Sequence, residues 1–149
     1  MKMDALALLQ AEKHCRDLVL AAAEAVDKQA YESLVALFTE TATLVRPGGQ
    51  PLQGRAEILA SYNAKSADRL TRHLVCNHRV EVQSAGLAQS RCTVLLYVSD
   101  KRRELTRQGR AADPAYQLGE ISDQLVLTAD GWRIQQREAW FELQLGQTS

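Results

Sequence analysis

The sequence predicts one α+β domain over residues 1–149, with helices packed on one face of a strongly curved, mainly antiparallel sheet. Three observations predict this class. Apolar residues recur at helical spacing up to about residue 60, and strand-like runs rich in Val, Leu and aromatic residues fill the stretch after residue 70. A length of 149 residues suits one hydrophobic core, because two domains of half this size would each be marginal.

Three helices are expected in the N-terminal part. Over residues 4–26, one stripe of a long helix is formed by Leu8, Cys15, Leu18, Val19, Ala22, Ala23 and Val26. A second helical pattern covers residues 31–38, and Gly54 can open a third helix that ends before Leu70. Between these two, the β-branched run over residues 41–45 indicates a strand that ends at the Pro47-Gly48-Gly49 turn.

Four strands are expected in the C-terminal part, joined as an antiparallel meander. They cover residues 70–83, 87–99, 116–128 and 132–143, with tight turns at 84–86 and 129–131. The stretch 100–114, with five basic residues, is expected to be a long loop.

The net charge and the N-terminal sequence argue against several classes of function. Eighteen basic and eighteen acidic residues cancel, so no nucleic-acid or anionic-membrane partner is expected. Lys2, Asp4, Glu12 and Lys13 interrupt the apolar N-terminus, so neither a signal peptide nor a membrane span is expected and a cytoplasmic location is predicted.

The three cysteines are expected to be reduced, buried thiols, because their number is odd and no CxxC spacing occurs. Cys76, His78 and Cys92 could share a sheet face, but their spacing matches no usual zinc pattern. No metal site is predicted.

His73 is the first candidate for chemistry, since only histidine changes charge near neutral pH without help from its surroundings. Strand alternation predicts that His73, Val75 and Asn77 point to the same face of the sheet. Asp27, near the end of the first helix, could orient the imidazole and complete an acid/base dyad. The alternative is that Asp27 caps the following helix.

Asp123 and Tyr97 are further candidates. A two-residue turn at Asp130-Gly131 would place Asp123 opposite Glu138, where two carboxylates cannot both ionise cheaply. Alternatively, Arg137 or Arg133 neutralises the pair, or this end of the sheet is exposed to solvent. If Glu81 pairs with Arg91, Tyr97 shares the face of Val75; the alternatives are ordinary packing of Tyr97, or a register slip that turns it away.

The opposite face of residues 70–99 is predicted to be apolar. Its members would be Leu74, Cys76, Val80, Val82, Cys92, Val94, Leu96 and Val98. Because large apolar patches on soluble monomers are rare, this face predicts a homodimer packed sheet to sheet.

Several short pieces, in order along the chain, carry a family resemblance. They are Ala25-Val26-Asp27 with Leu34 and Leu37-Phe38, Leu52 with Gly54-Arg55 and Ile58, Arg72-His73 with Asn77, Gly119 with Asp123, and Asp130-Gly131-Trp132-Arg133-Ile134 with Arg137. With them the chain resembles the SnoaL-like branch of the nuclear transport factor 2-like (NTF2-like) superfamily. The resemblance implies a cone-shaped barrel in which three helices close a bent sheet around an apolar cavity.

The resemblance also implies a function. Relatives include scytalone dehydratase, polyketide cyclases and the small β subunits of ring-hydroxylating dioxygenases, and many use no metal or organic cofactor. Similarity to scytalone dehydratase places Asp27 and His73 at two of its acid/base positions. Its tyrosines are missing here, since Val26 stands beside Asp27.

The expected function is therefore a cofactor-independent lyase or isomerase, of the dehydratase or cyclase type, acting on a small apolar or aromatic molecule. His73 and Asp27 would be catalytic, and Asn77, Tyr97 and Asp123 would contact the substrate. The alternative is a non-catalytic ligand-binding module or a β-type subunit of a ring-hydroxylating dioxygenase.

Overall fold

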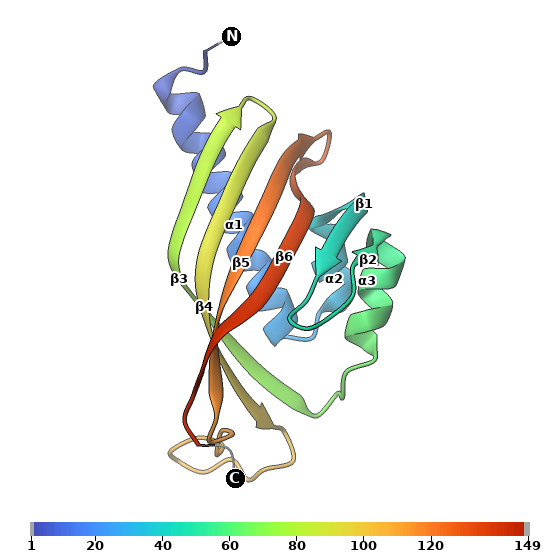
Figure 1. Cartoon of the computed structure of the whole chain (residues 1–149), viewed down its shortest axis with the longest axis vertical. Coiled ribbons are helices and arrows are strands. Elements are labelled where there is room, and N and C mark those ends of the chain that lie inside the picture. The colour runs from blue at the N-terminus through green and yellow to red at the C-terminus, as the bar shows by residue number, and fades with distance from the viewer. Residues whose placement is uncertain (1, 148–149) are drawn as a thin grey trace.

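The computed structural model describes residues 2–147 and has helices on one side of a single six-stranded sheet (Figure 1). The elements are α1 (Ala5–Asp27), α2 (Tyr31–Ala36), β1 (Phe38–Val45), β2 (Leu52–Gln53), α3 (Gly54–Asn63), β3 (Arg69–Ser84), β4 (Leu87–Asp100), β5 (Tyr116–Thr128) and β6 (Gly131–Leu145). The strand order is β2-β1-β6-β5-β4-β3, and only β1 and β6 pair in parallel. The α+β class with a mainly antiparallel sheet is confirmed.

The long helix α1 crosses behind β3, β4, β5 and β6, while α2 and α3 lie beside β1 and β2 (Figure 1). The four long strands twist strongly towards the end of the molecule that carries the C-terminus. Within residues 2–147, no helix has both the length and the apolar character needed to cross a membrane.

The start and the packing of α1 follow from its sequence. The Asp4 side chain caps the helix by accepting a hydrogen bond of 2.7 Å from the backbone N–H of Ala7. The buried stripe consists of Ala11, Cys15, Leu18, Val19, Ala22 and Ala25. The second helix is shorter than predicted, because the chain leaves it at Ala36 and Phe38 begins β1 as a fully buried residue.

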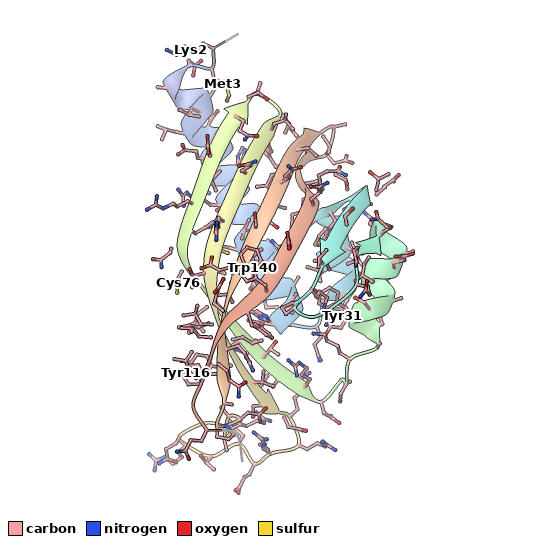
Figure 2. All side chains as sticks on the ribbon, viewed as in Figure 1. Lys2, Met3, Tyr31, Cys76, Tyr116 and Trp140 are labelled. Carbon is pink, nitrogen blue, oxygen red and sulfur yellow. The ribbon has the colours of Figure 1, made fainter. Side chains whose placement is uncertain are left out.

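The main core lies between the helices and the sheet. Its largest fully buried side chains are Leu34, Phe38, Leu44, Ile58, Leu125 and Ile134. Cys15 and Cys92 are also buried, and burial raises the pKa of both thiols to about 11. Cys76 is only partly buried, and Figure 2 places it at the margin of β3.

A β-bulge in β3 decides which residues face the helices. Asn77 has a φ of 48°, a left-handed conformation, and the pairing with β4 shifts at this point. Before the bulge, His73 and Val75 face inward; after it, Val80 and Val82 pack on the core. The prediction that Asn77 shares the face of His73 is therefore wrong, because the inserted residue reverses the alternation and leaves Asn77 exposed.

The predicted placement of Tyr97 on the face of Val75 is also wrong, because of the same bulge. His73 pairs with Leu96 and Val75 with Val94, so Tyr97 points to the opposite face. There its ring stacks on that of Tyr116, with centroids 4.9 Å apart.

The outer face is also not the predicted one. Of its predicted members, Val80 and Val82 pack on the core, and Cys92 and Val94 are buried. The residues that do lie across the outer face form a row of directly paired leucines, Leu74, Leu95, Leu118 and Leu143, on four adjacent strands.

Candidate active site

A cavity of about 300 Å³ lies between α1, α3 and the sheet. Its apolar lining includes Val19, Ala23, Val26, Leu44, Val75, Val94, Leu96, Ile121 and Phe141. Its polar lining consists of Arg46, Tyr62, Lys65, Arg69, His73 and Arg137. The cavity therefore combines an apolar interior with a small set of ionisable groups, as ligand sites commonly do.

His73 and Asp27 meet at this cavity. Asp27 is the last residue of α1, and its Oδ1 lies 2.5 Å from Nδ1 of His73 on β3. The same carboxylate accepts hydrogen bonds of 2.9 Å from the backbone N–H of His73 and from the hydroxyl of Thr71. The side chains of His73 and Asp27 are only 20% and 13% exposed. Three contacts thus fix the carboxylate against one edge of the imidazole.

These contacts determine the charge of Asp27. Burial alone would raise the pKa of Asp27, but the hydrogen bonds from the His73 side chain and backbone, with that from Thr71, lower it below its usual range. An ionised Asp27 accepts the Nδ1 proton, so the neutral imidazole keeps Nε2 bare. Nε2 is then the ring nitrogen available to a ligand.

The capping alternative for Asp27 is wrong. The residue at the N-cap of α2 is Ala30, and no side chain of the described residues caps that helix. The carboxylate is instead directed to β3, where it bonds Thr71 and His73.

Asp123 forms a buried ion pair with Arg137 and does not face Glu138. Two hydrogen bonds of 2.7 Å join the carboxylate to the guanidinium of Arg137. The predicted register is wrong because the hairpin turn consists of Ala129 and Asp130, and the pairing slips by one residue further along β6. Neutralisation by Arg137, the alternative interpretation of the sequence, is what occurs.

Arg137 lines the cavity, whereas its partner Asp123 does not. Burial opposes the charge of Arg137, but the charge and hydrogen bonds of Asp123 outweigh burial and raise the pKa of Arg137 above its ordinary value. The cavity therefore contains a permanent cation that a carboxylate holds in place. Sequence reasoning treated Arg137 only as a neutralising partner.

Tyr62 was also missed, because its place on the apolar side of α3 suggests ordinary packing. It is buried in the cavity wall, and burial raises the pKa of its hydroxyl. The ring of Tyr31 lies 5.2 Å from that of Tyr62, centroid to centroid. Figure 2 shows Tyr31 near α2, on the side of the molecule that carries α3.

Of the five residues predicted for the site, only His73 is among the residues that line the cavity in the described part of the chain, and Asp27 contacts His73 without being part of the lining. Asp123 acts behind the cavity wall, through Arg137. Asn77 and Tyr97 are not part of the lining, because the bulge turns both away from it.

Comparison with known families matches residues 7–138 to the SnoaL-like domain. This match covers most of the chain. None of the curated proteins is similar enough in sequence to count as a match.

Many solved structures share the fold. A candidate scytalone dehydratase from Novosphingobium aromaticivorans is 19% identical, with a TM-score of 0.76 over 97% of this chain and 90% of that one. A hexachlorocyclohexane dehydrochlorinase is 16% identical, with a TM-score of 0.81 over 98% and 95%. An NTF2-like protein with a cystatin-like fold, also from N. aromaticivorans, is 21% identical, with a TM-score of 0.75 over 91% and 84%. At these identities the likeness establishes an NTF2-like fold.

Proposed function

This chain belongs to the SnoaL-like domain family, and on that basis we propose that it is a cofactor-independent lyase or isomerase. The substrate is a small, mostly apolar molecule with a carbonyl or hydroxyl group. The observation that carries the proposal is the dyad of Asp27 and His73, set in the wall of an apolar cavity.

In the proposed reaction, Nε2 of His73 removes a proton from a carbon next to a carbonyl group. The electron pair of the broken C–H bond moves toward the carbonyl oxygen and gives an enolate. Asp27 stabilises the imidazolium that forms, because the carboxylate stays ionised and bonded to Nδ1. In an isomerisation, the substrate has a C=C bond next to the deprotonated carbon, so the enolate extends over that bond and the imidazolium returns the proton to its far carbon while the double bond moves into conjugation with the carbonyl.

In a dehydration, the enolate instead expels a hydroxyl group from the β carbon. The electron pair becomes the new C=C bond, and the proton on the imidazolium goes to the departing hydroxide to give water. The guanidinium of Arg137 can stabilise the negative oxygen in either reaction, since Asp123 holds it at the cavity wall. A cavity with an apolar lining strengthens this interaction by excluding water.

Hydrogen–deuterium exchange tests the proposal with simple ketones that serve as probes of the base. A panel of bicyclic ketones, including 2-tetralone, is incubated with the protein in D₂O, and loss of the proton next to the carbonyl is followed by NMR. We expect exchange above the buffer rate for at least one ketone, and a fall of roughly 10²-fold or more in the His73→Gln variant.

Asn77→Ala is the matched control for this experiment, because Asn77 lies on the same strand but outside the cavity. Its exchange rate should equal that of the unmodified protein. Equal rates for the unmodified protein and His73→Gln across the panel would overturn the assignment of the base.

We also propose that two copies of the chain pair through the outer sheet face. The row of paired leucines supports this, since Leu74 is 45% exposed and Leu143 is 56% exposed. A two-fold axis would let the same row serve both copies. The free, buried thiols of Cys15 and Cys92 fit the reducing cytoplasm, which we propose as the location.

Sedimentation at micromolar concentration tests the pairing. The unmodified chain should sediment as a dimer, and the double variant Leu74→Glu with Leu143→Glu as a monomer. Leu105→Glu, in the loop between β4 and β5, is the control and should stay dimeric. A monomeric unmodified chain contradicts the pairing.

A further inference from the structure

Three cationic side chains converge on the cavity from the ends of different elements. Arg46 follows β1, Lys65 follows α3, and Arg69 begins β3. All three line the same cavity as His73 and Arg137, and all three are half-buried.

Within residues 2–147, none of the three has a carboxylate partner. The ion pairs there involve other cations, and Arg137 is already balanced by Asp123. Arg46 donates a hydrogen bond of 3.0 Å to the hydroxyl of Ser61 and lies 4.7 Å from the centre of the Tyr62 ring. Lys65 lies 5.4 Å from the same ring centre. These contacts supply no opposite charge to the three cations.

Arg69 gives the clearest sign of a missing ligand. Its Nε is buried and has no hydrogen-bond partner among the described residues. A buried N–H without a partner is unfavourable, because the group has lost its water and gained nothing in return.

The pKa of Lys65 is also shifted by its burial beside the other two cations. Burial, and then the charges of Arg46 and Arg69, lower the pKa of Lys65 to about 8. An anion placed among the three side chains would remove this repulsion and supply the missing acceptor.

We propose that Arg46, Lys65 and Arg69 bind an anionic oxygen group, a carboxylate or a phosphate monoester, on a ligand whose apolar body fills the cavity. The apolar lining of the cavity that these cations share with His73 includes Val26, Val75 and Leu96. The inference rests on the proposed function in one respect: it assigns the reacting part of the same ligand to His73. The substrate class is then an apolar acid whose anionic group and reacting carbon are separate parts of one molecule.

Calorimetric binding of three probes at pH 7 tests the anion site. The probes are 2-naphthoate, 2-naphthyl phosphate and 2-naphthamide, which share one ring system and differ in charge. We expect one or both anions to bind at least about tenfold more tightly than the amide, the ratio expected from one charge-assisted hydrogen bond. Which anion binds more tightly identifies the group.

Variants at two of the three cations locate this preference. Arg69→Met and Lys65→Met should each remove most of the preference for the anion while binding of 2-naphthamide is unchanged, which also shows that the cavity is folded. Arg107→Met removes the same charge from an exposed loop position and should behave like the unmodified protein.

Two results overturn the anion site: equal affinity for the anions and the amide, including no binding of any probe, or equal losses in Arg69→Met and Arg107→Met. The readout is binding and needs no turnover. Failure of the anion site is therefore distinguishable from failure of His73 as a base, which the exchange experiment measures separately.

Discussion

Asp123 and Arg137 face each other across β5 and β6 and are joined by two hydrogen bonds of 2.7 Å, with side chains that are 1% and 7% exposed. Removing one partner leaves a buried charge unpaired. We expect Asp123→Asn to lower the free energy of unfolding by about 3–5 kcal/mol, measured by urea denaturation.

Glu138→Gln is the control for this variant, because Glu138 is exposed and pairs with Ser122. Its effect should stay within about 0.5 kcal/mol. Similar effects in the two variants would mean that Asp123 has no buried charge partner that depends on it.

Asp27→Asn tests the orienting role of the carboxylate. The amide cannot accept the Nδ1 proton through its nitrogen or stabilise the imidazolium by charge, so we expect kcat for proton exchange to fall by roughly 10²-fold or more. Because Asp27 acts through His73, KM should change little. A variant with full kcat would show that the imidazole needs no partner.

The same variant has a pH-dependent effect on stability. The pKa of Asp27 is lowered in the folded state, so its contribution is present at neutral pH and is lost as the pH falls below about 4. The hydrogen bonds lost in Asp27→Asn should cost roughly 1–3 kcal/mol at pH 7, and less at pH 3. Urea denaturation at the two pH values measures this difference, and a constant cost would contradict it.

Lys65 predicts a pH dependence of anion binding. Its pKa of about 8 means that it is charged at pH 7 and largely neutral at pH 9, and a bound anion favours the charged form. Affinity for 2-naphthoate should therefore fall between pH 7 and pH 9, and calorimetry should show this fall reduced in Lys65→Met. An equal fall in that variant would assign the titration to another group.

The left-handed conformation of Asn77 in the β3 bulge determines which substitutions this position tolerates. At a φ of 48°, a β-branched residue is strained, whereas glycine is not. We expect Asn77→Val to cost about 1–2 kcal/mol in urea denaturation. Asn77→Gly should be within about 0.5 kcal/mol of the unmodified protein. A neutral Asn77→Val would argue for a regular strand at this point.

The helices, the long strands and the meeting of Asp27 with His73 could be predicted from the sequence. Helical and strand periodicities differ enough to separate the two halves of the chain, and the ordered family pieces indicated where α1 ends relative to β3. The order of the four long strands needed no fine register, because strands that follow one another in the chain are usually neighbours in a sheet, with a short turn or, between β4 and β5, a long loop. The pairing of β1 with β6 was not predicted.

The errors at Asn77, Tyr97 and Asp123 share one cause. Side-chain direction in a strand has a period of two, so a single inserted residue moves every following side chain to the other face, as the bulge in β3 and the irregularity at Gln124 and Leu125 do. A turn centred one position away keeps the face but shifts each cross-strand partner by two residues. The only local sign of the β3 bulge was Asn77 itself, a residue that tolerates the left-handed conformation better than most.

The cations of the cavity could not be predicted for a different reason. Arg46, Lys65 and Arg69 follow or begin three separate elements, and they come together only as lining residues of one cavity in the folded chain. No spacing in the sequence marks such a cluster.

The tautomer of His73 decides whether its Nε2 can act as the base. A long-range ¹H–¹⁵N spectrum of the ¹⁵N-labelled protein, with His73 assigned by comparison with His73→Gln, reports which ring nitrogen carries the proton when the ring is neutral. We expect a proton on Nδ1, a bare Nε2, and a change in the Nε2 signal when 2-naphthoate is added. A proton on Nε2, with no response of that nitrogen to any cavity ligand, would contradict this expectation.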